Sequence, residues 1–596
     1  MPKTDIAIEL LGDRAFLLRW AGEITAAQLA FCAKLLNGAE FLWLSETVPA
    51  FRTIACHLRD NSFGVREPAE EALRLVRSSN LPAGGEQRRV IELPAFYGGV
   101  AGPDLAFCAT SSGLTENEFI ARHASATYEV AMLGFAPGFP YLSGLDSALS
   151  QPRRATPRLK VPAGSIGIAG EQTGVYSVMS PGGWQIIGRT DVPLFRPDSE
   201  RPFLLAPGDR VRFVAADMGE GGTDAGRFEH SYVERIAERE DGSHVFKREG
   251  TESDALTVLK PGVLTTIQDL GRSGWQAFGV SRGGAMDRVS LRKANVLVGN
   301  DEGAAALEVT LIGGEYAANR DIVVAICGAD LGASVSGSKL PMNRPVLLRK
   351  GAQLTFGAAA SGCRAYVAIA GGIDVPVVLG SRATDARARI GGGVGRALQA
   401  GDRIRCYKSG EMTFFDQLRR KAEADGSDWS APSWSASGWE EGVAPTMVRM
   451  SGKRRLIPIR LLPGAEWERF GEDVRAQLFR EAYRVKTTSD RMGVRLNGLA
   501  IPISEGGEME SHGVSPGTIQ VPSDGQPIVL AMNCQPTGGY PKLANVIAAD
   551  LPLLAQAAPG DWLSFSLTDT DSADRALQQR EREHAQLKAG LKLMMR

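Results

Sequence analysis

The sequence is poor in metal-ligand clusters, in long apolar runs and in charge of one sign. Its seven cysteines form no CxxC pair and its six histidines are dispersed, so we expect reduced thiols and no metal site. No stretch approaches 18 apolar residues, and the start, MPKTDIAIELLGD, does not resemble a signal peptide. These absences predict a cytoplasmic protein without a membrane span. The 67 basic and 68 acidic residues leave a net charge of -1, which argues against nucleic acid as the main partner.

Loops that carry common covalent or nucleotide chemistry are also missing. Two GxSxG strings occur, at Ser281 and Ser515. Pro516 has no N–H to offer an oxyanion, and no apolar strand precedes Ser281, so neither string predicts a nucleophile elbow. The sequence has no Walker A string, no Ala-Met-Lys-Met biotin site and no Gly-Gly-Ser-Ser-Gly-Gly amidase loop. A covalent biotin or a nucleophilic serine would have to come from another chain.

Glycine and proline are abundant, with 69 and 32 residues, which is above the usual share of roughly 12%. Many tight turns indicate a mainly β fold with α+β parts. Two helices are well marked: Thr115-Glu116-Asn117-Glu118 forms a capping box before one, and the other ends the chain. The pattern predicts a division into seven segments. They are a small α/β sandwich (1–85), a β-barrel (86–216), a linker (217–254), a β-rich domain (255–420), a Trp- and Ser-rich insertion loop (421–455), a second barrel (456–570) and a C-terminal helix (571–596).

An internal echo predicts that the barrel is duplicated. The first half reads VPAGSIGIAGEQTG, MSPGGWQIIGR and APGDRVRF, and the second half reads SPGTIQVPSDGQP, CQPTGGYPKLANV and APGDWLSF. Each copy has a Gly-x-Ile string, a proline shortly before a Gly-Gly-aromatic turn, and a closing Pro-Gly-Asp. Two copies in one chain favour a site at the seam between them. The alternative is a chance likeness between glycine-rich hairpins.

The paired turns supply the candidate site residues. Glycines let backbone N–H groups approach an anion, so Gly182, Gly183, Gly538 and Gly539 are expected to contact substrate. Trp184 and Tyr540 follow them as covers for a planar ring, and Arg189 and Lys542 as holders of a carboxylate or phosphate. The alternative is a pair of ordinary hairpins with packed rings.

Further candidates complete this set. His123 lies within the first helix and Asp490 in a loop of the second half, and we expect both beside Arg189 and Lys542 in the catalytic set. An ordinary packing residue and an exposed ion pair with Arg491 are the alternatives. The remaining substrate-binding candidates are Gln172, Tyr176 and Gln520.

The longest strings resemble the allophanate hydrolase-like (Kip inhibitor and Kip antagonist) family. GFAPGFPYL, TPRLKVPAGSIGIAGEQTGVYSVMSPGGWQIIGRT and PFLLAPGDRVRF resemble its first subunit, whereas IQDLGRSGWQAFGVSRGGAMD, SDRMGVRL and PTGGYPKLANVIAADLPLLAQAAPGD resemble its second. The resemblance implies a fusion of both subunits with cyclophilin-like barrels. It also implies a relation to the carboxyltransferase part of urea carboxylase.

Bacterial relatives of this pair imply a role in ATP-dependent 5-oxoprolinase, with ATP and Mg²⁺ and a separate LamB/YcsF-type subunit. Two alternatives are a biotin-dependent carboxyltransferase component acting on a urea-like substrate, with biotin on another chain, and a regulatory protein that inhibits a histidine kinase. A homo-oligomer is compatible with each function. One departure from the family pattern stands out: where an acidic residue and a Thr-Thr pair are expected before GGYP, the chain has Asn533 and Cys534-Gln535-Pro536-Thr537.

Overall fold

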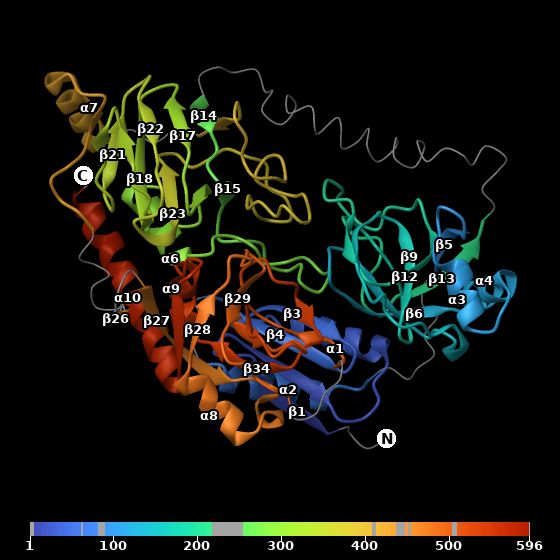
Figure 1. Cartoon of the computed structure of the whole chain (residues 1–596). Helices are drawn as coiled ribbons and strands as arrows, with labels where there is room; N and C mark the ends of the chain where they lie inside the picture. The colour runs from blue at the N-terminus through green and yellow to red at the C-terminus, as the bar shows by residue number, and fades with distance from the viewer. Residues whose placement is uncertain are drawn as a thin grey trace.

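The structure is a computed structural model that describes residues 5–60, 64–81, 90–216, 254–407, 413–436, 448–450, 454–503 and 509–594. Figure 1 shows two barrels, a small N-terminal sheet beside the second of them, and a third β region above. Over these ranges, no helix is both long enough and apolar enough to cross a membrane. The predicted linker at 217–254 lies almost wholly outside the described residues.

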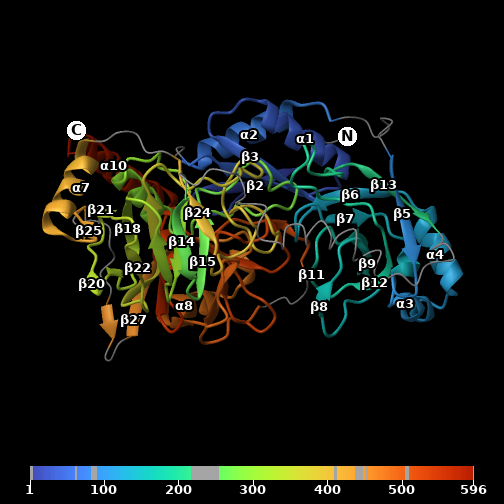
Figure 2. The same ribbon diagram turned by 90° about the horizontal axis from the view of Figure 1, so that it is seen from above.

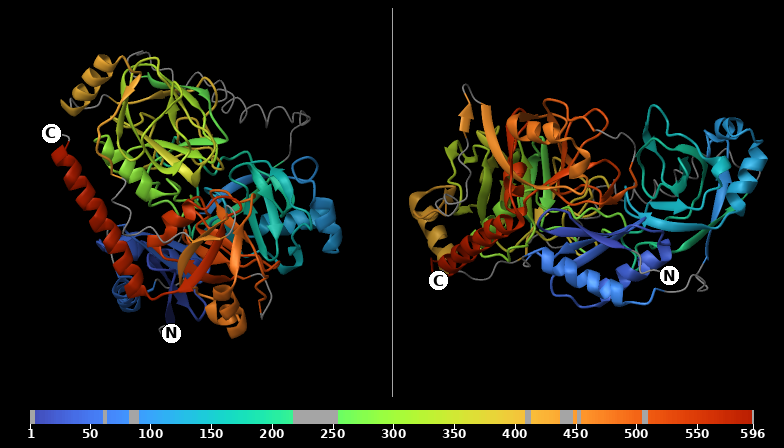
Figure 3. Two further views of the ribbon diagram at one scale, coloured as in Figure 1. Left: turned by 60° about the vertical axis from the view of Figure 1, so that its left-hand side comes forward. Right: turned by 90° about the horizontal axis from the view of Figure 1, so that it is seen from below.

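The N-terminal part is an antiparallel sheet with two helices on its outer side (Figures 2 and 3). Its elements are β1 (Ile6–Leu10), β2 (Ala15–Trp20), α1 (Ala26–Gly38), β3 (Leu44–Ala50), β4 (Thr53–Leu58) and α2 (Arg66–Ser78). Strand β3 was not predicted, because LSETVPA does not alternate polar and apolar residues. Pro49 is tolerated there because β3 is the edge strand in the order β1-β2-β4-β3.

The first barrel is closed, in the strand order β10-β7-β6-β13-β5-β12-β9. Its strands are β5 (Val90–Tyr97), β6 (Tyr128–Leu133), β7 (Pro140–Ser143), β9 (Ser165–Ala169), β10 (Gln172–Val175), β12 (Gln185–Arg189) and β13 (Arg210–Ala215). Outside it lie α3 (Leu105–Ser111), α4 (Glu116–Ser125), η1 (Ser147–Leu149) and the pair β8 (Arg158–Val161) and β11 (Ser180–Gly182). The capping box of α4 is confirmed, since Thr115 and Glu118 exchange hydrogen bonds.

The middle region contains two six-stranded sheets that share one apolar core. The first holds β14 (Asp254–Lys260), β17 (Glu315–Ala318), β19 (Ser334–Val335), β20 (Ser338–Lys339), β22 (Gln353–Thr355) and β24 (Arg403–Arg405). The second holds β15 (Leu264–Gln268), β16 (Ala306–Thr310), β18 (Ile322–Asp330), β21 (Pro345–Leu348), β23 (Ser361–Ile369) and β25 (Trp429–Ser430). Helices α6 (Arg288–Leu297) and α7 (Thr413–Asp425) pack against the second sheet.

The predicted insertion loop therefore begins within α7. Of its three tryptophans, Trp429 packs on the shared core and Trp434 packs against Phe414 of α7. Trp439 lies outside the described residues.

The second barrel repeats the first, which confirms the predicted mainly β fold with a duplicated barrel. Its strand order is β27-β34-β31-β32-β29-β28-β35, closed by the pairing of β27 with β35. The strands are β27 (Arg454–Pro463), β28 (Ala482–Val485), β29 (Gly493–Asn497), β31 (Thr518–Gln520), β32 (Ile528–Leu530), β34 (Lys542–Val546) and β35 (Trp562–Leu567), with β26 (Val448–Met450) at the edge. The outer pair β30 (His512–Gly513) and β33 (Thr537–Gly538) corresponds to β8 and β11. The remaining elements are η3 (Trp467–Arg469), α8 (Glu472–Arg480), η4 (Ala548–Asp550), α9 (Leu551–Ala555) and α10 (Thr570–Met594).

The parallel pairing of first and last strand is the clearest sign of duplication. β13 pairs with β5 in parallel, and β35 pairs with β27 in the same way. Helix α10 then runs from the second barrel back along the middle region, where Leu587 and Leu591 join its core (Figure 1).

Candidate functional site

A seam joins the two halves of the chain where the β6–β7 loop of the first barrel meets the second half. The Gly138 N–H donates to the Phe278 carbonyl at 2.8 Å, and Leu133 and Phe278 form an isolated β-bridge. A side chain at Gly134 would come within 2.6 Å of Thr537 Oγ1 on β33. The small residues of the GFAPG string therefore let the β6–β7 loop, the segment at Phe278 and strand β33 approach one another closely.

A buried ion network lies on the second-half side of this seam. Arg491 donates through Nε to Asn533 Oδ1 at 3.0 Å, and through its other nitrogens to the Glu308 carboxylate and the Gly284 carbonyl. Glu308 is 1% exposed. Burial would raise the pKa of Glu308, but the charges of Arg491 and Arg364 lower it. The network therefore keeps a carboxylate ionised inside the protein.

Arg272 is a second buried cation beside Asn533. Its side chain is 1% exposed and donates from Nη2 to the Ala383 carbonyl at 2.5 Å. Its Nε and Nη1 have no hydrogen-bond partner in the ranges that the structure describes. A Cβ built on Gly283 would lie 3.4 Å from Arg272 Nη1 and 3.8 Å from Asn533 Nδ2, with no other neighbour within 4 Å. Two donors thus converge on a small open space, an arrangement suited to an oxygen that gains negative charge.

Asp490 lies at the same seam. Its Oδ1 accepts from the Met492 and Gly493 N–H groups at 2.8 and 3.1 Å. Its charge acts on Arg387, whose guanidinium lies 4.7 Å from the ring centroid of Phe135 in the GFAPG loop. The structure therefore places Asp490 near Arg387, and Arg387 contacts the GFAPG loop of the first half.

The first-barrel candidates form an aromatic cluster beside the seam. Tyr176 and Trp184 pack edge-on against Phe139, with ring centroids 5.1 and 5.4 Å away, and both are buried. A Cβ on Gly182 would overlap the Tyr176 ring. Ala388 and Ile390 of the middle region complete this cluster. These rings therefore fill the interface between the first barrel and the middle region.

The neighbouring first-barrel candidates have fewer contacts. Gly183 has nothing nearer to an added Cβ than Pro157, at 3.7 Å. Gln172 begins β10, opposite Ala169, and is half-buried.

His123 is placed in the core of the first barrel. Its ring nitrogens lie 2.7 Å from Tyr97 Oη and 3.0 Å from Thr173 Oγ1, and the residue is 0% exposed. Burial lowers the pKa of His123 to about 3, so the imidazole is neutral at physiological pH. The contacts are those of a packing residue, and a catalytic role stays a prediction.

The strand registers show that Arg189 and Lys542 are not equivalent positions. Arg189 pairs with Ser165, and Asn545 pairs with Thr518 at the matching place in the second barrel. Counting back along each strand, Lys542 corresponds to Ile186. The two predicted cations therefore lie three residues apart in the repeated unit, and Arg189 is half-buried on β12.

Lys542 belongs to a buried polar cluster of its own, under the N-terminal sheet. Its Nζ donates to the Gly538 carbonyl at 2.7 Å, and its N–H donates to Glu466 Oε2 at 3.0 Å. Glu466 Oε1 lies 2.8 Å from His512 Nε2. Burial lowers the pKa of Lys542 to about 8. Burial opposes ionisation of Glu466, but His512 and Lys542 lower its pKa to about 2.

The Gly-Gly turn of the second barrel lies above this cluster. Gln520 is buried against Gly538, and its Nε2 has no hydrogen-bond partner among the described residues. Gly539 approaches the Met509 carbonyl, so that a Cβ there would lie 3.0 Å from that oxygen. Tyr540 is 49% exposed, unlike Trp184 at 6%. Lys542 therefore fixes the turn that carries the predicted ligand groups.

Sequence reasoning missed Arg272, Glu308, Glu466 and His512 as members of these clusters. Glu466 and Lys542 are 76 residues apart, and Glu308 and Arg491 are 183 apart. No local spacing signals such pairs. The IQDLGR string was noted, but nothing in it shows that Arg272 is buried.

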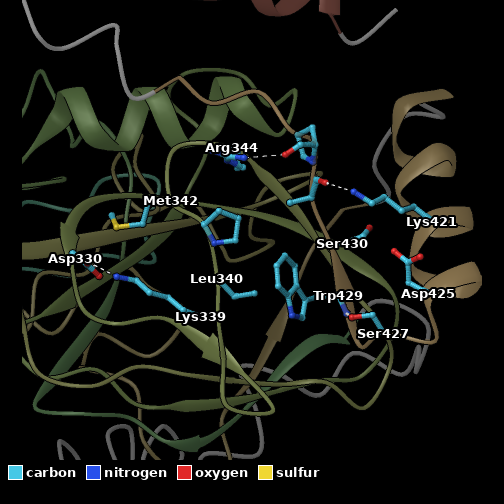
Figure 4. A pocket seen from close by; sticks show the side chains of 13 residues that line it. Asp330, Lys339, Leu340, Met342, Arg344, Lys421, Asp425, Ser427, Trp429 and Ser430 are labelled. Carbon is cyan, nitrogen blue, oxygen red and sulfur yellow. Dashed lines mark hydrogen bonds and ion pairs between the residues drawn. The ribbon is translucent and has the colours of Figure 1, made fainter.

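An open pocket of about 780 Å³ lies elsewhere, between α7 and the strands of the middle region (Figure 4). Trp429 and Leu340 line it, and Lys339 pairs with Asp330 at its edge at 3.0 Å. None of the predicted site residues lines it.

Comparison with known proteins assigns both halves. Residues 6–205 match the family model "Carboxyltransferase domain, subdomain C and D", and residues 278–567 match "Carboxyltransferase domain, subdomain A and B". The chain is 42% identical to the B-type subunit of 5-oxoprolinase from Escherichia coli O157:H7 over 211 residues, which are 35% of this chain and 96% of the relative. It is 36% identical to the C-type subunit of 5-oxoprolinase from Escherichia coli K12 over 332 residues, 56% of this chain and 97% of the relative.

Two further relatives match different shares of the chain. The crystal structure of TTHA0988 is 32% identical and covers 93% of this chain and 99% of its own, with a TM-score of 0.74. The urea amidolyase of Saccharomyces cerevisiae is 32% identical over 324 residues, 53% of this chain but 17% of that protein. The chain therefore belongs to the carboxyltransferase-domain family, with a half similar to the B-type subunit of 5-oxoprolinase followed by a half similar to its C-type subunit.

Proposed function

We propose that this chain provides the B-type and C-type components of an ATP-dependent 5-oxoprolinase in one polypeptide. One observation carries the proposal: relatives named as two subunits of the same enzyme are each matched over 96% and 97% of their own lengths. The seam supports it, because Arg491, Asn533 and the GFAPG loop bring groups from both halves together.

The proposed reaction hydrolyses the lactam of 5-oxoproline at the expense of ATP. The lactam carbonyl oxygen takes the terminal phosphoryl group of ATP, water adds to the activated carbon, and the C–N bond breaks with loss of phosphate. The products are glutamate, ADP and phosphate. Both steps place negative charge on oxygen and need positioned donors rather than a nucleophilic triad.

In this chain the groups suited to that task are the amide of Asn533 and the Arg272 nitrogens that have no partner among the described residues. In this proposal Lys542 is a positioning residue, because its Nζ donates to the Gly538 carbonyl and so fixes the Gly-Gly turn. Within the described ranges, no group of three or more His, Cys, Asp or Glu side chains is placed to hold a metal ion. The Mg²⁺ that accompanies ATP is not assigned to this chain.

The proposed partner is a LamB/YcsF-type subunit, and reconstitution tests it. The purified chain and that partner are assayed, alone and together, for ATP-dependent release of glutamate from 5-oxoproline. We expect activity only with both proteins, and loss of that activity in Arg272→Met. The exposed Arg582→Met serves as the matched control. Silence of the verified mixture would count against the proposal.

A biotin-dependent carboxyl transfer is the second candidate, because both family models carry the carboxyltransferase description. Its assay is carboxylation of urea with a biotinylated carrier chain. Urea-dependent turnover without any response to 5-oxoproline would favour it.

A further inference from the structure

A cavity of about 310 Å³ lies where four parts of the protein meet. The β1–β2 turn and the end of β4 contribute one wall, and residues of the 270–292 segment contribute another. The second barrel, through Ser515 and Asn545, and helix α10 complete it. This volume lies at the lower end of the range for small-molecule sites. Arg282 and Met532, which line the cavity, are chain neighbours of Gly283 and Asn533 at the seam.

Two buried side chains reach this cavity with polar atoms that lack partners. Asn545 is 2% exposed and accepts through Oδ1 from Thr518 Oγ1 at 2.9 Å, but its Nδ2 has no partner in the described part of the chain. His57 is 8% exposed, and its Nε2 is likewise without a partner there. Buried polar groups are normally hydrogen-bonded, because an unsatisfied one costs free energy. A polar ligand in the cavity would satisfy both.

The charges around the cavity select the sign of that ligand. Asp60 pairs with Arg282 and Arg288 at 2.7 and 2.6 Å. Arg292 pairs with Glu302 and Glu581 at 2.8 and 2.6 Å. In these pairs three arginines face three carboxylates, and Glu302 also pairs with Lys588 at 2.7 Å.

The other charged side chains of the lining are Arg14, Arg580 and Asp13. Asp13 accepts from the Ala548 N–H at 3.0 Å. Arg580 makes no hydrogen bond or ion pair within the described ranges, although the Asp287 and Asp550 carboxylates act on it from outside the lining. Arg580 therefore offers the cavity one guanidinium group, whose N–H donors suit a single carboxylate.

The remaining lining is apolar, with Leu11, Met286 and Leu577 among its members. A ligand that fits has one anionic group and a compact apolar body. From this we infer that the cavity binds a small organic monocarboxylate, with its carboxylate held by Arg580 and the Asn545 amide. The inference rests on the proposed function only for the choice of 5-oxoproline, which is such an anion, as the first probe.

Calorimetric titration of the full chain with 5-oxoproline tests the inference without any partner protein. We expect saturable binding that weakens at least ten-fold in Arg580→Met and in Leu577→Phe, which narrows the cavity and keeps its charges. The exposed Arg582→Met on the same helix should bind like wild type. The neutral amide of 5-oxoproline and inorganic phosphate should each bind at least ten-fold more weakly than the acid.

Each contrary result overturns the inference. Absence of carboxylate binding by wild type would do so, as would equal binding by folded Arg580→Met and Leu577→Phe, or equal affinity for acid and amide. The proposed function fails separately. If binding depends on Arg580 but the reconstituted hydrolase is silent, the cavity inference stands and the proposed function is wrong. If Arg580→Met turns over 5-oxoproline with an unchanged KM, the proposed function stands and the cavity inference is wrong.

Discussion

Replacing Lys542 by methionine tests what a fully buried ammonium group does in this protein. Folding takes the ammonium out of water, and the fall of its pKa from 10.5 to about 8 corresponds to about 3 kcal/mol of lost stability at neutral pH. The variant removes that cost but leaves the Gly538 carbonyl without its donor, which costs about 1–3 kcal/mol. The two effects oppose each other. We therefore expect a free energy of unfolding within about 2 kcal/mol of wild type at pH 7, measured by urea titration.

The pH dependence gives the sharper test of Lys542. Because the folded pKa lies below the unfolded one, the unfolded chain binds more protons between about pH 8 and 10.5, and wild-type stability rises through that window. Relative to Lys542→Met, wild type should gain about 2 kcal/mol from pH 7 to pH 10. Lys160→Met, at an exposed lysine, should show no such difference. A pH-independent gap between wild type and Lys542→Met would refute the reasoning.

Turnover separates a structural lysine from one that the site needs. If the lysine positions the Gly538-Gly539 turn for substrate, turnover of the reconstituted enzyme should fall roughly 100-fold although the fold survives. Unchanged turnover in a folded variant would remove Lys542 from the site.

Three further changes probe other parts of the molecule. Burial raises the pKa of Asp13 from 3.8 to about 6, so ionisation of Asp13 costs stability progressively between about pH 4 and pH 6, and the full cost is present above that window. Asp13→Asn should therefore stabilise the protein by up to about 3 kcal/mol at pH 8, and urea titration should show this gain vanish near pH 4. Gly182→Ala should lower the free energy of unfolding by about 1–3 kcal/mol, because the new methyl group overlaps the Tyr176 ring. Gly183→Ala has 3.7 Å of clearance and should leave the melting temperature unchanged. Equal changes in melting temperature for the two variants would contradict the packing described. Asn533→Asp should place a carboxylate against Arg491 and Arg272 and raise the free energy of unfolding by about 1 kcal/mol. A lower free energy of unfolding would mean that other carboxylates already balance those two guanidinium charges.

Local patterns were enough to predict the duplicated barrels and the start of α4. The repeated Gly-x-Ile, Gly-Gly-aromatic and Pro-Gly-Asp strings lie at the same places in both barrels, because each marks a turn whose backbone needs small residues. Thr115 and Glu118 cap α4 through contacts three residues apart. Strand β3 escaped prediction because its packing, rather than its own pattern, makes it a strand.

The clusters of the candidate site could be predicted only in part. Gly182 and Gly538 were predicted from the paired Gly-Gly turns and Asp490 from its place in a loop, and their roles stay predictions. The contacts that place these residues at the seam, such as that of Arg387 with Asp490, involve segments far apart in the sequence. Arg189 and Lys542 were predicted as a pair of cations, but Arg189 follows Gly183 by six residues and Lys542 follows Gly539 by only three. The strand registers agree with this offset, because both barrels carry the bulge at the same place. Burial of Arg272 depends on the packing of Gly271 against the Gly283 carbonyl, which no spacing encodes.

The parallel pairing of the first and last strand in each barrel has a consequence for how the chain folds. β5 meets β13 about 120 residues later, and β27 meets β35 about 100 residues later, so neither barrel can close until its final strand has left the ribosome. Such long-range pairing raises the contact order and slows folding. Until closure, β5 and β27 expose unpaired edges that invite association with other chains. Co-translational chaperone binding should therefore concentrate in the two intervals before β13 and β35 emerge.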